Sequence, residues 1–139
     1  MKVIRPEGWP RPRGYSHATA ASGTTVFISG QIGWDEHERF VADDIAGQTR
    51  QALQNIVSIV TEAGGTAESV ARMTWYVVDK RDYLAHAAAV GAAYRDVMGK
   101  HFPAMSVVEV AALVEDRALV EIEATAVVER RGALEPERR

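Results

Sequence analysis

Alternation of apolar and polar residues near the C-terminal end of the chain restricts the fold more than any other feature. Every second residue from 120 to 126 is apolar, and the positions between them hold Glu121, Glu123 and Thr125. Successive side chains of a strand point to opposite faces, so this pattern predicts a strand with one buried and one polar face. The more uniformly apolar segment 107–113 predicts a neighbouring strand covered on both faces. The polar residues 115–117 are expected to connect the two strands. Such a pair of strands, one of them bearing carboxylates, is suited to holding a reacting group.

Two earlier segments have the apolar spacing of amphipathic helices. The first helix is predicted to start at a cap formed by Asp43 or Asp44 and to end at Gly64. The second is predicted to start near Asp82 and to end at Gly99. Its residues are mostly small, which would allow close approach to a sheet.

The remaining segments predict three further strands. Residues 15–20 and 25–29 are expected to form a hairpin, and residues 70–78 a strand between the two helices. The order β-β-α-β-α-β-β predicts an α+β domain with two helices on one face of a mixed sheet. We expect residues 1–139 to form one domain, with residues 1–13 as an extended, irregular arm and residues 131–139 as a tail.

Composition excludes several classes of site. The chain has no cysteine, which excludes disulfides, thiolate nucleophiles and sulfur-ligated metals, and its net charge of −3 argues against nucleic-acid binding. The basic residues near the ends are expected to be solvated; they are Arg5, Arg11, Arg13, Arg130, Arg131, Arg138 and Arg139. The sequence has no signal-peptide-like or membrane-spanning apolar run, so we expect a cytoplasmic protein that does not bind a membrane.

The sequence also lacks the familiar patterns of metal and nucleophile sites. The histidines show no metal-ligand spacing and are expected at the surface; they are His17, His37, His86 and His101. Neither a nucleophile elbow nor a glycine-rich phosphate loop is present. The sequence therefore predicts a protein without metal or cofactor.

Three separated parts of the chain carry recognisable motifs. Residues 102–113 are F-P-A-M-S-V-V-E-V-A-A-L, followed by V-E-I-E-A at residues 120–124. Residues 14–16 are G-Y-S, residues 26–32 are V-F-I-S-G-Q-I, and residues 48–55 are Q-T-R-Q-A-L-Q-N. Together they resemble the RidA family, also called YjgF/YER057c/UK114, whose members hydrolyse reactive imines and enamines. The resemblance implies a chorismate-mutase-like fold and a homotrimer with a barrel-like core and a pocket at each subunit interface, which takes a small molecule.

The resemblance also implies which residues carry the chemistry. Glu121 matches the acidic position that positions or activates the attacking water, and a partly desolvated carboxylate would have a raised pKa. Tyr15, Ser29 and Gly30 match residues that line the family's pocket. Without the resemblance, Glu121 would be taken for a solvated residue of the strand, and Tyr15 and Ser29 for ordinary residues at strand ends.

Two positions depart from the imine-hydrolysing members. Met105 stands where those members carry an arginine that binds the substrate carboxylate, so the chain resembles an arginine-lacking branch. Gly91 stands where several members carry asparagine, whereas the backbone N–H of Val107 is available whatever the side chain. Arg13 lies two residues before Tyr15 and would project on the same side of an extended segment, so it is a candidate for the missing charge.

Three functions follow as hypotheses. The first is a cofactor-independent hydrolytic deaminase of a reactive imine or enamine, with a pocket made non-standard by Met105. The second is a non-catalytic trimer that binds a small metabolite or regulates a partner enzyme. The third, RNA cleavage, is disfavoured by the acidic balance of charge.

Overall fold

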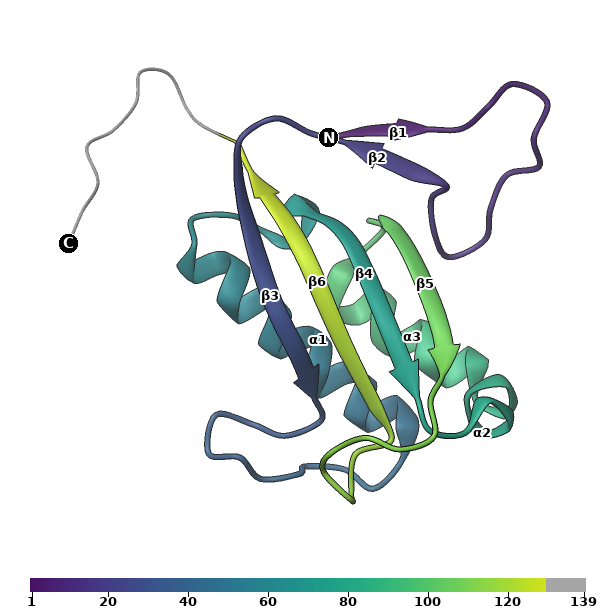
Figure 1. Ribbon diagram of the computed structural model, residues 1–139, viewed down its shortest axis with the longest axis vertical. Helices are drawn as coiled ribbons and strands as arrows, with labels where there is room; N and C mark the ends of the chain where they lie inside the picture. Colours follow the sequence, from purple (N-terminus) through teal and green to yellow (C-terminus); the bar gives the residue numbers. More distant parts are fainter. Residues whose placement is uncertain (130–139) are drawn as a thin grey trace.

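A four-stranded mixed sheet with helices on one face forms the body of the protein, for which a computed structural model describes residues 1–129 (Figure 1). The strand order is β3 (Thr24–Ile32), β6 (Val120–Val128), β4 (Val70–Val77) and β5 (Ala104–Glu109). Strand β6 is antiparallel to both of its neighbours, and β5 is parallel to β4. Helices α1 (Ile45–Glu62) and α3 (Ala87–Met98) cover one face. The predicted α+β class, with two helices on one face of a mixed sheet, is confirmed.

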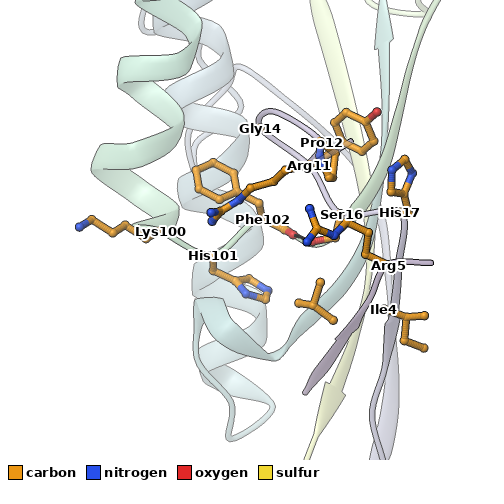
Figure 2. Close-up of a pocket in the computed structure, with 12 residues that line it drawn as sticks. Ile4, Arg5, Arg11, Pro12, Gly14, Ser16, His17, Lys100, His101 and Phe102 are labelled. Atoms are coloured by element: carbon orange, nitrogen blue, oxygen red, sulfur yellow. Dashed lines mark hydrogen bonds between the residues drawn. The ribbon is translucent and has the colours of Figure 1, made fainter. Parts of the chain in front are cut away.

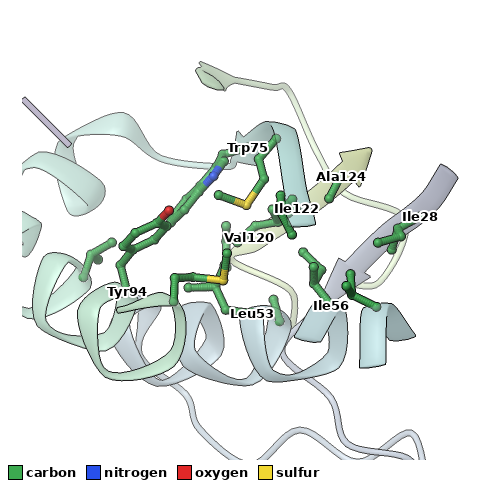
Figure 3. Packing of buried hydrophobic residues seen from close by; sticks show 14 of the residues in the cluster. Ile28, Leu53, Ile56, Trp75, Tyr94, Val120, Ile122 and Ala124 are labelled. Atoms are coloured by element: carbon green, nitrogen blue, oxygen red, sulfur yellow. The ribbon is translucent and has the colours of Figure 1, made fainter. Parts of the chain in front are cut away.

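The core lies between this sheet and the two helices. The apolar residues of β6 are buried against α1, where Leu53 and Ile56 are fully enclosed (Figure 3). Each such side chain stabilises the fold by about 1.5–3 kcal/mol through removal from water. Glu121, Glu123 and Thr125 lie on the opposite face, which no helix covers within residues 1–129. The alternation predicted for this strand is confirmed.

Helix α1 begins and ends where its caps predict. The Asp44 carboxylate accepts a hydrogen bond from the Gly47 N–H at 3.4 Å, and Gly64 follows the last turn with a φ of 91° that favours glycine. Near its start the buried Gln48 side chain donates to the carbonyl of Arg117 and accepts from the N–H of Leu119. This glutamine anchors the helix to the loop before β6.

The second helical segment is two helices, so the prediction of one helix starting near Asp82 is wrong. Helix α2 (Lys80–Ala85) begins after Asp79, whose carboxylate accepts from the N–H groups of Arg81 and Asp82. His86 leaves the helical conformation, with φ −113° and ψ 21°, and α3 starts immediately after it. The predicted end at Gly99 is confirmed. A short 3₁₀ turn (Ala67–Ser69) leads from α1 into β4.

The predicted N-terminal hairpin is wrong. Strand β2 (Ala18–Ala20) pairs with β1 (Lys2–Ile4), inside the arm expected to be irregular, and not with β3. Strand β3 already has β6 as its partner from Thr24 onward. Gly23 brings the chain so close to β6 that a Cβ there would lie 2.2 Å from the carbonyl oxygen of Val128. The chain therefore crosses from the small sheet to the large one at this glycine.

The prediction that the two C-terminal strands pair with each other is also wrong. Strand β5 ends at Glu109, pairs with β4 at the edge of the sheet, and is separated from β6 by the segment 110–119. Both edges of β6 are occupied by β3 and β4, which leaves β5 no place beside it. Val107 and Val108 are 38% and 44% exposed, so this strand is not covered on both faces within the described chain.

No helix within residues 1–129 combines the length and the apolar character needed to cross a bilayer. The predicted tail, 131–139, lies outside the described residues.

Candidate functional site

The predicted site residues form two groups on opposite faces of the sheet. Met105 is paired with the buried Met73, and Val107 with Trp75, so both point to the helix-covered face. Glu121 is paired with Tyr76 on the face without helices. One ligand bound to a single chain therefore cannot contact both groups.

The helix-side group lines a cavity of about 350 Å³. Among the predicted residues, the structure brings Tyr15, Gly91, Met105 and Val107 together here, and Arg13 lines the same cavity. Volumes of this order hold small metabolites. We name this cavity the helix-side pocket; its remaining lining residues are Gly14, Trp75, Tyr83, Ala87, Val90, Tyr94, Arg95 and Phe102.

Five aromatic side chains line the helix-side pocket: Tyr15, Trp75, Tyr83, Tyr94 and Phe102. The rings of Tyr94 and Phe102 are stacked with centroids 5.3 Å apart, and the Tyr94 hydroxyl donates to the carbonyl of His101 at 2.5 Å. Burial raises the pKa of Tyr94 and of Tyr83 above the usual value for tyrosine. Both are therefore neutral near pH 7, so the aromatic part of the wall carries no charge and the charged groups of the wall are Arg13 and Arg95. The Trp75 indole N–H is buried and has no hydrogen-bond partner within residues 1–129.

Tyr15 is held at the mouth of this pocket by the residue that follows it. The Ser16 N–H donates to the carbonyl of Pro103 at 3.0 Å, and the Ser16 hydroxyl donates to the carbonyl of Phe102. These bonds tie the N-terminal segment to the start of β5, and Ser16 is buried. The G-Y-S motif and the F-P-A motif, distant in sequence, thus build one wall.

Arg95 is a pocket residue that the sequence reasoning missed. It lies one helical turn after Gly91 on α3, and a Cβ at Gly91 would be 3.3 Å from its Nη1. The spacing of four residues on a predicted helix is the signal that could have revealed it, because such positions share a face. The aromatic wall had no comparable signal, since its five rings come from five different segments of the chain.

The second group, on the open face, comprises Ser29, Gly30 and Glu121. The half-buried Glu121 carboxylate lies against the backbone of Gly30, where a Cβ would be 2.1 Å from its Oε2. Only glycine leaves room for the carboxylate in this position. A bulge in β3 between Ile28 and Gln31 places Ser29 and Gly30 beside β6.

A tyrosine and a second carboxylate flank Glu121. The Tyr76 hydroxyl donates to Oε1 of Glu123 at 2.5 Å. This hydrogen bond raises the pKa of Tyr76, and desolvation and the negative charges of Glu123 and Glu121 raise it further. Tyr76 is therefore a neutral donor near pH 7, engaged with Glu123.

A second cavity, of about 740 Å³, adjoins the helix-side pocket and shares Gly14, Tyr15 and Phe102 with it (Figure 2). Arg5 and Arg11 from the N-terminal arm and Lys100, which follows the C-cap of α3, supply its lysine and arginine side chains, and Lys100 points away from the two arginines. Arg5, Arg11 and Arg13 are exposed, as predicted.

The histidines do not assemble into a metal site within residues 1–129, where no group of three or more histidine, aspartate or glutamate side chains could hold an ion. His101 is not at the surface as predicted: its Nε2 lies 2.6 Å from the carbonyl oxygen of Val70 in a partly buried position.

Comparison with known proteins gives consistent relatives. Residues 10–128 match the family model described as endoribonuclease L-PSP. A RutC family protein of Pyrococcus horikoshii is 40% identical over 127 residues, covering 90% of this chain and 96% of that protein. The 2-iminobutanoate/2-iminopropanoate deaminase of Salmonella typhimurium is 38% identical over 129 residues, covering 91% and 97%. The crystal structure of YyfB of Yersinia pestis, from the conserved Rid protein family, has a TM-score of 0.81 and 36% identity, covering 91% and 98%.

Proposed function

Since the chain belongs to the RidA (YjgF/YER057c/UK114) family, we propose that it is a cofactor-independent hydrolytic deaminase of a reactive imine or enamine. The observation that carries this proposal is the Glu121 carboxylate, held half-buried against the backbone of Gly30. A carboxylate fixed in this way can accept a proton from a water molecule beside it. The relative named 2-iminobutanoate/2-iminopropanoate deaminase supports the same class of reaction.

The reaction adds one water molecule across a C=N bond. Glu121 accepts a proton from the water as its oxygen bonds to the carbon, and the proton passes to the nitrogen. The hydroxyl group formed at that carbon then transfers its proton to the nitrogen as the C–N bond breaks, and ammonia and a carbonyl compound leave. Tyr15, Ser29 and the backbone N–H of Val107 orient the substrate. Imines already hydrolyse in water without a catalyst. An acceleration of about 10²–10⁴-fold, from positioning and proton transfer, is therefore sufficient for an enzyme of this class.

We further propose that the complete site forms between subunits of a homotrimer. The two groups of site residues lie on opposite faces of one chain, so they can meet only if one subunit covers the open face of another. Phe27 supports this arrangement, because it is paired with Thr125 on the open face and is 82% exposed. Covering the Phe27 side chain with another subunit would remove its ring from water, which is favourable by about 1.5–3 kcal/mol.

Replacing Phe27 tests the subunit arrangement. Phe27→Asp is expected to shift the protein from trimer to monomer in light scattering after size-exclusion chromatography, with unchanged far-UV circular dichroism. Leu84→Asp, at a residue of α2 that is 63% exposed, is the matched control and should remain trimeric. A wild-type monomer would refute the trimer.

Ammonia release tests the activity. An amino-acid oxidase generates 2-imino acids in place, and the release of ammonia is timed with and without the protein. Wild type is expected to accelerate release, and Glu121→Gln to abolish the acceleration. Glu123→Gln is the matched control, because it lies on the same face of β6 and glutamine still accepts from Tyr76.

Met105 favours a second candidate function, a trimer that binds a small metabolite without turning it over. The residue removes a positive charge from the pocket and replaces it with a flexible thioether. Met105→Arg separates the candidates. Activity gained only in this variant would show a working catalytic frame used on another ligand; ligand binding without turnover in any variant would favour the binding protein.

A further inference from the structure

We propose that Arg95 is the residue that binds a ligand carboxylate in the helix-side pocket, and that the protein therefore selects small carboxylates with a planar, unsaturated body. The inference deepens the proposed function and rests on it for the use of this pocket. Four observations carry it: the position of the Arg95 guanidinium, its lack of an ion pair, the absence of acidic groups in the pocket wall, and the aromatic surfaces around it.

Gly91 provides the space that Arg95 occupies. Side chains of a helix lean toward its N-terminus, so a long side chain at position 95 extends over position 91. The distance of 3.3 Å between Nη1 of Arg95 and a Cβ built at Gly91 places the guanidinium on this bare patch of helix backbone. Both residues line the same pocket as Met105. The two departures from the family pattern, at positions 91 and 105, thus occur together with a positive charge at Arg95 on α3.

The Arg95 guanidinium is available to a ligand. Arg50 and Arg117 are paired with Asp96 and Asp43 at 3.0 and 2.7 Å, whereas Arg95 has no ion pair within residues 1–129. Its neighbour Asp96 is the partner of Arg50. An arginine left unpaired offers its planar fork of N–H donors to a carboxylate, which accepts two parallel hydrogen bonds from it.

The rest of the wall restricts what the carboxylate can belong to. None of the described residues that line the pocket is acidic, so nothing there repels an anion. Tyr83, Tyr94 and Phe102 present rings, and Met105 adds an adaptable apolar surface. A planar conjugated body can stack on such rings, whereas a polar body would lose its hydration without replacement. Arg13, at the mouth, is placed to add long-range attraction.

Benzoate and benzamide form a matched pair of probes, because both are planar and they differ in charge. Binding to the full chain is measured by calorimetry at low salt, with no turnover required. Wild type is expected to bind benzoate at least about tenfold more tightly than benzamide, a difference of about 1.4 kcal/mol. Arg95→Gln should reduce the preference to about twofold or less, mainly by weakening the binding of benzoate.

Arg81→Gln is the control for net charge, because Arg81 is exposed on α2 and lies outside the pocket. It should keep the full preference, and Arg95→Lys should keep part of it. Thermal unfolding of each variant checks that the fold is retained. A wild type that binds the two probes equally, or an Arg95→Gln variant that keeps the preference, would overturn the inference; so would loss of the preference in Arg13→Gln alone.

The binding test and the ammonia test fail separately. If the wild type prefers benzoate through Arg95 but releases no ammonia, the inference about Arg95 is supported and the proposed activity is refuted. If the wild type accelerates ammonia release but has no Arg95-dependent preference for benzoate, the proposed activity is supported and the inference about Arg95 is refuted.

Discussion

The two faces of the central sheet differ in what covers them, although β6 contributes to both. On the helix-covered face Val120, Ile122 and Ala126 have no exposed surface, because α1 packs on β6. On the open face Glu121 and Glu123 are half-buried and Phe27 is 82% exposed. One face is completed by the chain itself, and the other is left for water, a ligand or another subunit. In the proposed function, alternate residues of β6 therefore have different roles: Ile122 supports the core and Glu121 takes part in the reaction.

Truncating the covered face should have the largest effect on stability. Ile122→Ala is expected to lower the free energy of unfolding by about 2–5 kcal/mol, because it leaves a cavity between β6 and α1. The free energy is measured by urea denaturation. Thr125→Ala, on the open face of the same strand, should cost less than about 1 kcal/mol. Equal costs at the two positions would contradict the division between the faces.

Changing the open face should affect activity with little loss of stability. In Gly30→Ala the added Cβ would lie 2.1 Å from Oε2 of Glu121, so the carboxylate must move. A displacement of about 1 Å can cost on the order of a hundredfold in rate. Ammonia release should fall by about this factor while the urea midpoint stays near that of wild type. Unchanged release would show that the position of Glu121 does not matter.

Alkaline pH should destabilise the fold through the covered face. An unfolded tyrosine loses its proton near pH 10, whereas the raised pKa of Tyr94 and Tyr83 keeps the folded residues protonated above that pH. Above pH 10 the unfolded state binds fewer protons, so the free energy of unfolding falls as pH rises, and below pH 10 this effect is absent.

Tyr94→Phe separates this pH effect from the general loss of stability at high pH. At pH 7 the free energy of unfolding of the variant should be lower by about 1 kcal/mol, because the hydrogen bond to the His101 carbonyl is lost. Above pH 10 its free energy of unfolding should fall less steeply than that of wild type. Urea denaturation between pH 7 and 11 measures both. An identical alkaline slope in the variant would assign the pH dependence to other groups.

The smallest expected effect is a gain in stability on replacing Gly91 with alanine. Gly91 lies inside α3, where alanine is about 0.5–1 kcal/mol more favourable than glycine. The Cβ would meet only the end of the flexible Arg95 side chain, at 3.3 Å, so Gly91→Ala should raise the melting temperature. It should also reduce the benzoate preference, because Arg95 has to shift. Higher stability with an undiminished preference would show that Gly91 is not needed to seat Arg95.

Local signals in the sequence determined several elements of this protein. The alternation in β6 and the Asp44 and Gly64 ends of α1 depend on residues within a few positions of each other, and the structure agrees with all of them. The motif resemblance identified the family and named Glu121 and Met105. Asp79 and Asp82 are competing helix caps before the second helical segment, and no residue near them decides between the two.

Tertiary structure decided the pairing of the strands and the composition of the site. An apolar strand pattern does not specify its partner, because the partner depends on which edges are already occupied; β5 was therefore displaced to the edge beside β4. The separation of Met105 from Glu121 follows from the register of that pairing. Arg95 became a pocket residue only when α3 was laid against the sheet with its Gly91 face toward β5. Residues far apart in sequence meet through packing, and no local pattern records that meeting.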